Sequence, residues 1–365
     1  MLESTSDFRK IALNRTPLID VRAPIEFDKG AFPNATNLPL MNDEQRHLVG
    51  KRYKEAGNEK AMELGHQLVS GDTKEHKVEA WIDQIKANPD SLIYCFRGGQ
   101  RSQISQQWIH DAGYDIDRLE GGYKAFRNYL YEQLATITND KEIIILGGHT
   151  GSGKTILLNK LEDSIDLEGT AHHRGSSFGR YATPQPTQIN FENELAYRFM
   201  EHDASGRKRL ILEDESRNIG QCYLIPALFE QMKEASVILL ETTLEERIGI
   251  TYAEYIIASQ LDYNIAYANG IQANSWIDTM RHNFQRIHKR LGDQGYKYMS
   301  KMLEDAWQHQ EKNSDPSMHK LWIEHLLKEY YDPMYSYQIA KKSDRIIFKG
   351  RENEIIEYLK DTSKV

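Results

Sequence analysis

Short runs of apolar residues alternate with longer amphipathic stretches along the first third of the chain. The runs at residues 17–21 and 92–94 predict short strands, and the stretches at 43–64 and 78–87 have the spacing of helices. An alternation of this kind is typical of a parallel sheet covered by helices. The pattern therefore predicts an α/β domain at the start of the chain.

A second alternation follows the short polar stretch 136–141, which we interpret as a linker. The pattern predicts a helix over 155–163, and from about 244 to 328 it becomes strongly helical and charged. Four apolar runs in this part predict strands: 143–146, 209–212, 237–240 and, late in the chain, 344–348. We therefore divide the chain into two α/β domains, residues 1–135 and 136–365, of which the second ends in a helical region.

Composition agrees with this division and limits the partners. A chain of 365 residues exceeds what one hydrophobic core usually supports. The formal net charge of -8 argues against a uniformly basic surface, so any RNA site must be a local patch of Arg and Lys. Two distant cysteines cannot form a disulfide framework, and neither an export signal nor a membrane-spanning run is evident. We expect a cytoplasmic protein with no membrane partner.

One loop carries the strongest chemical signal. The run from Cys95 to Ser102, Cys-Phe-Arg-Gly-Gly-Gln-Arg-Ser, directly follows the predicted strand 92–94 and precedes a predicted helix. Consecutive backbone N–H groups and a helix start stabilise anions, so we interpret Cys95 as a nucleophile rather than a buried small hydrophobe. Cys222 lacks such surroundings and is interpreted as structural. The loop residues expected to hold an anion are Arg97, Gly98, Gly99, Gln100 and Arg101.

Four segments around this cysteine resemble the rhodanese family and cover about residues 13–130. They are the cysteine loop, Leu-Ile-Asp-Val-Arg-Ala-Pro-Ile-Glu-Phe from residue 18, Gly-Ala-Phe-Pro-Asn-Ala-Thr-Asn-Leu-Pro from residue 30, and Leu-Glu-Gly-Gly-Tyr from residue 119. The resemblance implies that Cys95 accepts sulfur or selenium and that Asp20 and Arg22 brace the site. One spacing departs from the family, because Arg101 falls six residues after Cys95 instead of five. Cysteine-dependent phosphatases share this spacing, and their wider loop fits a tetrahedral phosphate.

The second domain begins with a complete phosphate-binding P-loop, Gly-His-Thr-Gly-Ser-Gly-Lys-Thr, between a predicted strand and a predicted helix. Its backbone amides are expected to surround a diphosphate, with Lys154 neutralising the charge and Thr155 in reach of a Mg²⁺ ion. The residues assigned to diphosphate binding are Gly148, Thr150, Gly151, Ser152, Gly153, Lys154 and Thr155.

A Mg²⁺ ion at this loop would also use a carboxylate near Thr155. Asp214 follows the apolar run 209–212 and is our candidate, although Glu213 and Glu215 beside it leave the choice open. No residue with the position of a water-orienting group is evident, so phosphate binding is better supported than hydrolysis of a nucleoside triphosphate.

Further polar segments are candidates for substrate contact, with an ordinary solvated surface as the alternative for each. They lie in the helical stretch before the cysteine, in the turn-rich stretch 171–179 and after the strand 209–212. The substrate-binding candidates are Gly65, His66, His173, Arg174, Ser176, Ser177, Arg217 and Asn218. The most basic helical segment supplies the candidates for RNA binding, which are Arg281, Arg286, Lys289 and Arg290.

In this order the motifs resemble the tRNA 2-selenouridine synthase family over nearly the whole chain. The likeness includes both loops, Leu-Gly-His from residue 64, His-Arg-Gly-Ser-Ser-Phe-Gly from residue 173, Glu-Asp-Glu-Ser-Arg-Asn-Ile-Gly from residue 213 and Leu-Gly from residue 291. It implies a rhodanese-like parallel-sheet domain followed by a P-loop NTPase-like α/β domain with a helical tRNA-binding extension.

The family resemblance also implies the reaction. The enzyme replaces the sulfur of 2-thiouridine at the tRNA wobble position with selenium from selenophosphate, after geranyl diphosphate has alkylated that sulfur. Selenophosphate and geranyl diphosphate are then co-substrates, and an enzyme that makes selenophosphate is a further expected partner. Cys95 either carries a perselenide or assists selenophosphate, and the residues leave this choice open.

Three other readings keep parts of this pattern. The first is an ATP-dependent sulfurtransferase or small-molecule kinase fused to a rhodanese sulfur carrier, which substrate-stimulated ATP hydrolysis would favour. The second is a cysteine phosphatase, which phosphate release from an aryl phosphate would favour. The third is a non-enzymatic tRNA-binding or regulatory module, which a dispensable Cys95 would favour.

Overall fold

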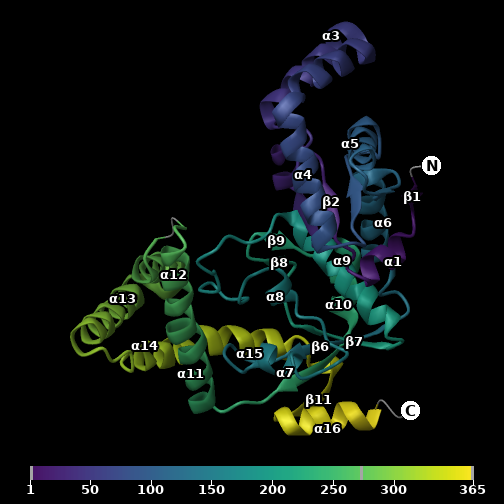
Figure 1. The fold of residues 1–365 in the computed structure, drawn as a ribbon. Helices are drawn as coiled ribbons and strands as arrows, with labels where there is room; N and C mark the ends of the chain where they lie inside the picture. Colours follow the sequence, from purple (N-terminus) through teal and green to yellow (C-terminus); the bar gives the residue numbers. More distant parts are fainter. Residues whose placement is uncertain (1–2, 272–273, 363–365) are drawn as a thin grey trace. The chain divides into compact units, whose positions relative to one another are not determined.

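The structure is a computed structural model that describes residues 3–271 and 274–362. Two compact units share the chain, and the first contains residues 1–137 together with residues 187–206 (Figure 1). The second contains residues 138–186 and 207–365. The predicted boundary at 136 therefore misses one segment, helix α9 (Gln188–Ala204), which returns to the first unit. It does so because its buried face, including Phe191 and Leu195, packs on helices of that unit.

A parallel sheet of five short strands, in the order β1-β5-β4-β2-β3, forms the centre of the first unit. The central strands β2 and β4 are buried at every position, as expected where helices cover both faces. The strand order reverses between them, and ligands bind at such a switch point in parallel sheets. The strands are β1 (Ser4–Thr5), β2 (Leu18–Asp20), β3 (Ala35–Asn37), β4 (Leu92–Tyr94) and β5 (Asp117–Leu119).

Helices cover both faces of this sheet. On one face Trp81 of α4 packs with Ile93 and Ile109, and its indole N–H donates to the Leu38 carbonyl at 2.9 Å. On the other face the ring of Phe126 packs against that of Phe32 in a tilted arrangement, with ring centroids 4.7 Å apart. The helices, besides α3 and α9, are α1 (Phe8–Leu13), α2 (Pro24–Lys29), α4 (Gly71–Ala87), α5 (Gln100–Asp111) and α6 (Gly122–Thr136).

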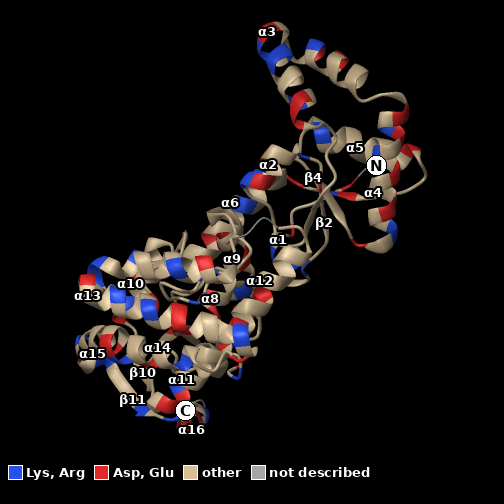
Figure 2. Ribbon diagram, turned by 90° about the vertical axis from the view of Figure 1, so that its left-hand side faces the viewer, with Lys and Arg blue, Asp and Glu red and all other residues tan. Residues whose placement is uncertain are grey.

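Helix α3 (Asp43–Leu68) is unusual because its middle packs on nothing in its own unit. Residues 51–60 are exposed at every position, and the helix is kinked at Gly57, where φ is 80°. Figure 1 shows α3 standing away from the sheet of its unit, and Figure 2 shows charged residues along it. The predicted helix is confirmed and continues to Leu68, whereas the next helix begins at Gly71, earlier than the predicted 78.

The second unit contains a parallel sheet in the order β11-β10-β6-β7. The predicted late strand is confirmed as β11 and pairs with β10. Helix α7 ends at Leu158 instead of 163, because the hydroxyl of Ser164 turns back to the carbonyls of Leu158 and Leu161. The strands are β6 (Glu142–Gly147), β7 (Arg209–Glu213), β10 (Ser236–Leu240) and β11 (Ile346–Gly350). α7 (Lys154–Leu158) and α16 (Glu352–Thr362) cover their shared apolar core.

The predicted helical region has its own core, built around Trp276, Phe284 and Trp322. Gly292, with φ of 70°, kinks the longest helix, and residues 272–273 of the predicted region lie outside the described residues. The elements are α11 (Leu244–Tyr252), the π-helix Ala253–Ala258, α12 (Ser259–Ala268), α13 (Trp276–Asn313), α14 (His319–Leu326), the π-helix Leu327–Tyr331 and α15 (Asp332–Ala340). The remaining helices are α8 (Leu167–Thr170), α10 (Pro226–Glu234) and the 3-10 turn Ser343–Arg345, and a hairpin joins β8 (Asn218–Ile219) to β9 (Cys222–Tyr223).

Candidate active site

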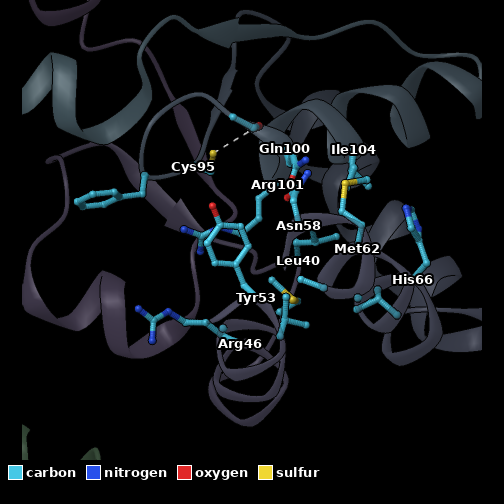
Figure 3. Close-up of a pocket in the computed structure, with 18 of the residues that line it drawn as sticks. Leu40, Arg46, Tyr53, Asn58, Met62, His66, Cys95, Gln100, Arg101 and Ile104 are labelled. Atoms are coloured by element: carbon cyan, nitrogen blue, oxygen red, sulfur yellow. Dashed lines mark hydrogen bonds between the residues drawn. The ribbon is translucent and has the colours of Figure 1, made fainter. Parts of the chain in front are cut away.

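Cys95 directly follows β4, at the switch point of the first sheet, and is 3% exposed. Its Sγ lies 3.2 Å from Ser102 Oγ and 3.7 Å from the Gly99 carbonyl oxygen (Figure 3). The Ser102 hydroxyl in turn bonds the Gly99 carbonyl at 3.0 Å. In the part of the chain that the structure describes, the N–H groups of residues 96–99 donate to no backbone carbonyl. These N–H groups therefore remain available to an anion beside the thiol.

A glycine turn supports this loop from behind. The N–H of Tyr123 donates to the Cys95 carbonyl and the N–H of Lys124 to the Phe96 carbonyl, both at 2.9 Å. Gly122 has φ of 60°, and a Cβ there would lie 2.3 Å from the Cys95 carbonyl oxygen. Only glycine permits this close approach.

Asp20 and Arg22 form a buried ion pair at the end of β2, with Nη2 and Oδ2 2.6 Å apart. The Tyr94 hydroxyl donates to the same carboxylate at 2.8 Å, and the guanidinium lies 3.8 Å from the ring centroid of Tyr123. Burial lowers the pKa of Arg22, but the hydrogen bonds to Asp20 outweigh it and the net shift is upward. Burial raises the pKa of Tyr94 well above its usual range. The pair therefore ties β2 to β4 and α6 around the cysteine loop.

Removing the charge of Asp20 is expected to destabilise the first unit. In Asp20→Asn the Arg22 guanidinium stays buried without a counter-charge, and breaking a buried pair in this way costs about 3–5 kcal/mol. We expect a lower urea midpoint for the first unit, measured by circular dichroism and tryptophan fluorescence. Asp28→Asn, at an exposed carboxylate, is the control, with a change within about 0.5 kcal/mol. Equal midpoints for the two variants would contradict the bracing role.

Glu26 of α2 fixes the Arg101 side chain beside the loop. Nη1 of Arg101 lies 2.6 Å from Oε2 of Glu26, and Nη2 lies 3.2 Å from Oε1. Burial alone would raise the pKa of Glu26, but the hydrogen bonds from Arg101 outweigh it and the net pKa lies below the ordinary value. A bidentate pair of this kind fixes the guanidinium plane. Arg97, by contrast, is exposed, and its guanidinium lies 5.8 Å from the centroid of the Phe96 ring.

A cavity of about 860 Å³ opens beside Cys95, between the loop, α3 and α5 (Figure 3). Two of the substrate-binding candidates, Gly65 and His66, line it, and the His66 ring lies 6.2 Å from that of Trp108. The structure thus brings Gly65 and His66 to the cysteine site, whereas the other substrate-binding candidates lie in the second unit.

The P-loop joins β6 to α7 with the backbone conformation that only glycine adopts easily. Gly148 and Gly151 have φ of 155° and 74°, and a Cβ on Gly151 would lie 2.3 Å from Thr251 Oγ1. Lys154 Nζ donates to the Gly148 carbonyl at 3.3 Å across the loop. The buried hydroxyl of Ser152 has no hydrogen-bond partner within the described residues. These features fit a cradle for a diphosphate.

Helix α11 and its neighbours hold the P-loop in place. Arg247 Nε donates to the Thr150 carbonyl at 2.9 Å, and the guanidinium forms a bidentate pair with Asp332 at 2.5 and 3.1 Å. The Thr242 hydroxyl donates to the Ser152 carbonyl at 2.9 Å. The loop is therefore preformed rather than dependent on a ligand for its shape.

The structure shows what surrounds the predicted metal ligand. Asp214 forms an ion pair with Lys342, a residue that sequence reasoning did not single out. Glu213 is fully buried, accepts the N–H of Leu167 at 2.9 Å, and has a pKa that burial raises well above its usual range. No group of His, Cys, Asp or Glu side chains is arranged to hold a metal ion in residues 3–271 and 274–362.

Two carboxyl groups that sequence reasoning did not single out, Glu168 and Glu254, join Glu215 as functional candidates in the second unit. Burial, together with a hydrogen bond to Glu168, raises the pKa of Glu215 well above its usual range, against the lowering effect of the Lys154 charge. Burial also raises the pKa of Glu254. Glu168 and Glu215 both lie beside Gly175, since a Cβ on that residue would lie 1.8 Å from Glu168 Oε1 and 2.8 Å from Glu215 Oε1. Carboxyl groups shifted in this way are suited to proton transfer.

The segment 171–179 packs against the helical region and does not form a loose loop. Burial, followed by the charge of Arg180, lowers the pKa of His173 to about 4, so His173 is neutral at physiological pH. The guanidinium of Arg174 lies 3.8 Å from the Tyr181 ring centroid, and the Tyr255 hydroxyl bonds Ser176 Oγ at 2.9 Å. Because His173 is neutral, Arg174 is the predicted substrate-binding residue in this segment that carries a positive charge.

The remaining candidates are more scattered. Arg217 and Asn218 are exposed beside the hairpin of β8 and β9. Arg281 pairs with Asp278 and Glu304, Arg286 donates to the Ser177 carbonyl at 3.4 Å, and Arg290 donates to the Tyr330 hydroxyl at 3.1 Å. Lys289 is exposed. Part of the positive charge on this helix is therefore already compensated within the protein.

Two family profiles match the chain one after the other, and the second includes helix α9, which the structure assigns to the first unit. The profile described as "Rhodanese-like domain" matches residues 5–129, and the one described as "tRNA 2-selenouridine synthase AAA domain" matches residues 141–365. Fold and sites thus define a rhodanese domain joined to a P-loop domain with a helical region, as predicted.

Curated relatives match over the full length. The chain is 53% identical over 360 residues to the tRNA 2-selenouridine synthase of Sulfurovum sp. (strain NBC37-1), covering 99% of each chain. It is 47% identical over 354 residues to that of Shewanella halifaxensis (strain HAW-EB4), covering 97% of each, and 43% identical over 364 residues to that of Pseudomonas syringae pv. syringae (strain B728a), covering 100% of each. The chain belongs to the tRNA 2-selenouridine synthase family. Within the described residues, none of the helices has both the length and the apolar character needed to cross a membrane.

Proposed function

We propose that the protein converts wobble 2-thiouridine in tRNA to 2-selenouridine with selenophosphate, through an S-geranyl intermediate made from geranyl diphosphate. Its relatives support modification of tRNA to 2-selenouridine. One observation supports the use of two donors in two steps. The chain has two separate anion-binding loops, the Cys95 loop and the P-loop, each after a central strand of its own parallel sheet. Two loops of this kind match two anionic donors used in successive steps.

In the first step, the P-loop binds the diphosphate of geranyl diphosphate. The sulfur of 2-thiouridine attacks C1 of the geranyl group, the carbon–oxygen bond breaks, pyrophosphate leaves and the N3 proton is lost. Backbone amides of the loop and Lys154 stabilise the charge that develops on the leaving group. The carboxyl groups of Glu215 and Glu254 are candidates to accept the proton, and the positive charge of Lys154 acts to lower the pKa of both.

The second step replaces the alkylated sulfur. A thiocarbonyl sulfur is a poor leaving group, whereas an alkylated sulfur departs as geranylthiol. Selenophosphate carries selenium at the oxidation level of selenide, the level found in 2-selenouridine. Its selenium attacks C2, geranylthiol leaves with a proton, and the product carries a phosphoryl group on selenium.

Cys95 then completes the reaction as a phosphoryl acceptor. Its thiolate attacks phosphorus, the phosphorus–selenium bond breaks and 2-selenouridine is released. Water then transfers the phosphoryl group from sulfur to give inorganic phosphate. A perselenide on Cys95 would instead require a two-electron oxidant, because selenophosphate is already fully reduced. The wide loop with Arg101 six residues after the cysteine, and Ser102 Oγ 3.2 Å from the thiol, supports this use.

The tRNA itself supplies an accessible base. A wobble nucleotide lies in an unpaired loop, so it can be splayed into a pocket, while Arg and Lys side chains hold the flanking phosphates. Arg286, Lys289 and Arg290, all exposed on α13, are the side chains of the basic cluster that form no ion pair among the described residues, whereas Arg281 is paired. The cytoplasm, where tRNA is found, is the location that fits this substrate.

Omitting the donors one at a time tests the proposal. Purified protein is incubated with 2-thiouridine-containing tRNA, geranyl diphosphate and selenophosphate, and nucleosides are analysed by mass spectrometry. Geranyl diphosphate alone should give the S-geranyl nucleoside, and 2-selenouridine should require both donors. Thiolated tRNA left unchanged with both donors present would refute the proposal. If tRNA-stimulated ATP hydrolysis then occurred instead, the ATP-dependent sulfurtransferase or kinase would be favoured.

A further inference from the structure

The cavity beside Cys95 is larger and more apolar than a site for a small anion requires. Its volume is about 860 Å³, and the loop supplies only one side of it. The remaining wall includes apolar side chains on α3, on α5 and on the segments just before and after α3. These are Leu40, Met41, Val49, Ala61, Met62, Val69, Ile104 and Trp108.

The charge around the cavity has one sign. Apart from Cys95 and Tyr53, the ionisable side chains that line it are all bases: Arg46, His47, Lys51, Lys54, His66, Arg97 and Arg101. Among the described residues, no aspartate or glutamate belongs to the lining, although Glu26 pairs with Arg46 and Arg101 nearby. A ligand for this cavity therefore combines an apolar part with negative charge.

Apolar and basic side chains are not evenly mixed around the cavity. Figure 3 shows Met62, Ile104 and His66 together on one side, Arg46 on the other, and Tyr53 between them. Tyr53 is 58% exposed, so its ring is available to a flat partner such as a base. Four of the apolar lining residues, Val49, Met62, Ile104 and Trp108, are half-buried and so partly open to solvent, and exposed apolar surface in a cavity marks a binding site.

We propose that this cavity binds the prenyl chain of the S-alkylated nucleoside during the selenium step. The chain lies against Ala61, Met62 and Ile104, which directs the C2–sulfur bond toward the Cys95 loop. Arg46, Lys51 and Lys54 on α3 hold the phosphates of the flanking nucleotides. The inference rests on the proposed function, and it adds a site for the alkyl group in the first unit, separate from the P-loop that binds the diphosphate.

This assignment gives the alkyl group a second purpose. Besides improving the leaving group, it anchors the modified base beside the selenium donor, so that geranylated tRNA is selected over thiolated tRNA. The apolar wall also accommodates the departing geranylthiol. Selection should then depend on the length of the alkyl chain rather than on alkylation alone.

Binding of free nucleosides tests the site without any turnover. The full-length protein is titrated calorimetrically with S-methyl, S-dimethylallyl and S-geranyl 2-thiouridine. We expect affinity to rise at least about tenfold at each step of the series, which adds about four and then about five carbons, since each buried carbon contributes to transfer from water. Met62→Trp fills the apolar side and should reduce binding of the geranyl nucleoside far more than that of the methyl nucleoside. Gln67→Trp, at an exposed position of α3 outside the lining, is the matched control and should bind like the wild type.

Turnover provides the second measurement. tRNAs carrying the same three alkyl groups are supplied with selenophosphate, and wild-type selenation should be fastest for the geranyl tRNA, whereas Met62→Trp should prefer the dimethylallyl tRNA. Equal affinity of the wild type for all three nucleosides, or an equal loss of all three in Met62→Trp, would overturn the proposal. If wild-type protein bound the nucleosides as expected but selenated none of the tRNAs, the proposed function would fail while the prenyl site would stand.

Discussion

Cys95→Ala is expected to abolish formation of 2-selenouridine while S-geranyl-2-thiouridine still accumulates. The alanine removes the group that accepts the phosphoryl moiety, and loss of a nucleophile that acts with its neighbours lowers turnover by roughly 10³-fold or more. The P-loop belongs to the other unit and retains all of its side chains, so geranyl transfer should continue. Nucleoside mass spectrometry after incubation with both donors measures the two products in one sample.

Cys222→Ala is the matched control for this variant. Cys222 is the other cysteine of the chain and is buried at 1% exposure in the second unit, so its loss should leave selenation within a few-fold of the wild type. Rapid quenching of the wild-type reaction, followed by mass spectrometry of the peptide that contains Cys95, identifies what the thiol carries. A phosphoryl group is expected. Selenium on that peptide without phosphorus would instead establish the perselenide route, and normal selenation by Cys95→Ala would remove the cysteine from the mechanism.

The parts of the fold that the sequence predicts well are those with a local physical cause. β4 and β6 are buried parallel strands, and such strands are continuous apolar runs that stand out from their surroundings. The two reactive loops follow these strands directly and contain glycines that the backbone requires, as at Gly151. The strands β1 and β8 have two residues each, too few to show any periodicity.

Contacts between distant segments account for what the sequence missed. Helix α9 has an apolar face, but nothing local to it indicates that this face packs on α6, far from its neighbours in sequence. Lys342 is separated by 128 positions from Asp214, whose carboxylate it neutralises. Sequence reasoning therefore did not foresee the lysine that pairs with the predicted metal ligand. Glu168 and Glu254 were missed for the same reason, because their environment arises only when three segments meet.

Helix α3 shows a different reason why the cavity could not be predicted from the sequence. Its helical pattern is readable from sequence, but ten consecutive exposed positions give no sign of what the helix encloses. The apolar residues that line the cavity are spaced along α3, α5 and the segment before α3, and each is an ordinary core residue by type. Only their arrangement around Cys95 shows that they line one cavity.

Lys154→Ala is expected to suppress geranyl transfer and, through it, 2-selenouridine formation from thiolated tRNA. Lys154 bonds the Gly148 carbonyl across the mouth of the P-loop and is the cation placed to meet the leaving diphosphate. Loss of one preorganised group that stabilises developing charge costs about 10²–10³ in turnover. Lys160→Ala, at an exposed lysine paired with Glu352 beyond α7, is the control and should retain normal rates. The initial rate of S-geranyl nucleoside formation measures the effect.

The decisive comparison supplies tRNA that is already geranylated. Lys154→Ala should convert this tRNA to 2-selenouridine at close to the wild-type rate, because the second step uses only the Cys95 loop and its cavity. Mixing Lys154→Ala with Cys95→Ala should likewise restore conversion of thiolated tRNA, since one variant makes the geranylated tRNA that the other consumes. Undiminished geranyl transfer by Lys154→Ala would refute the diphosphate assignment. Failure of that variant on geranylated tRNA would show that the P-loop also acts in the selenium step, and the division of the two reactions between the two units would then be wrong.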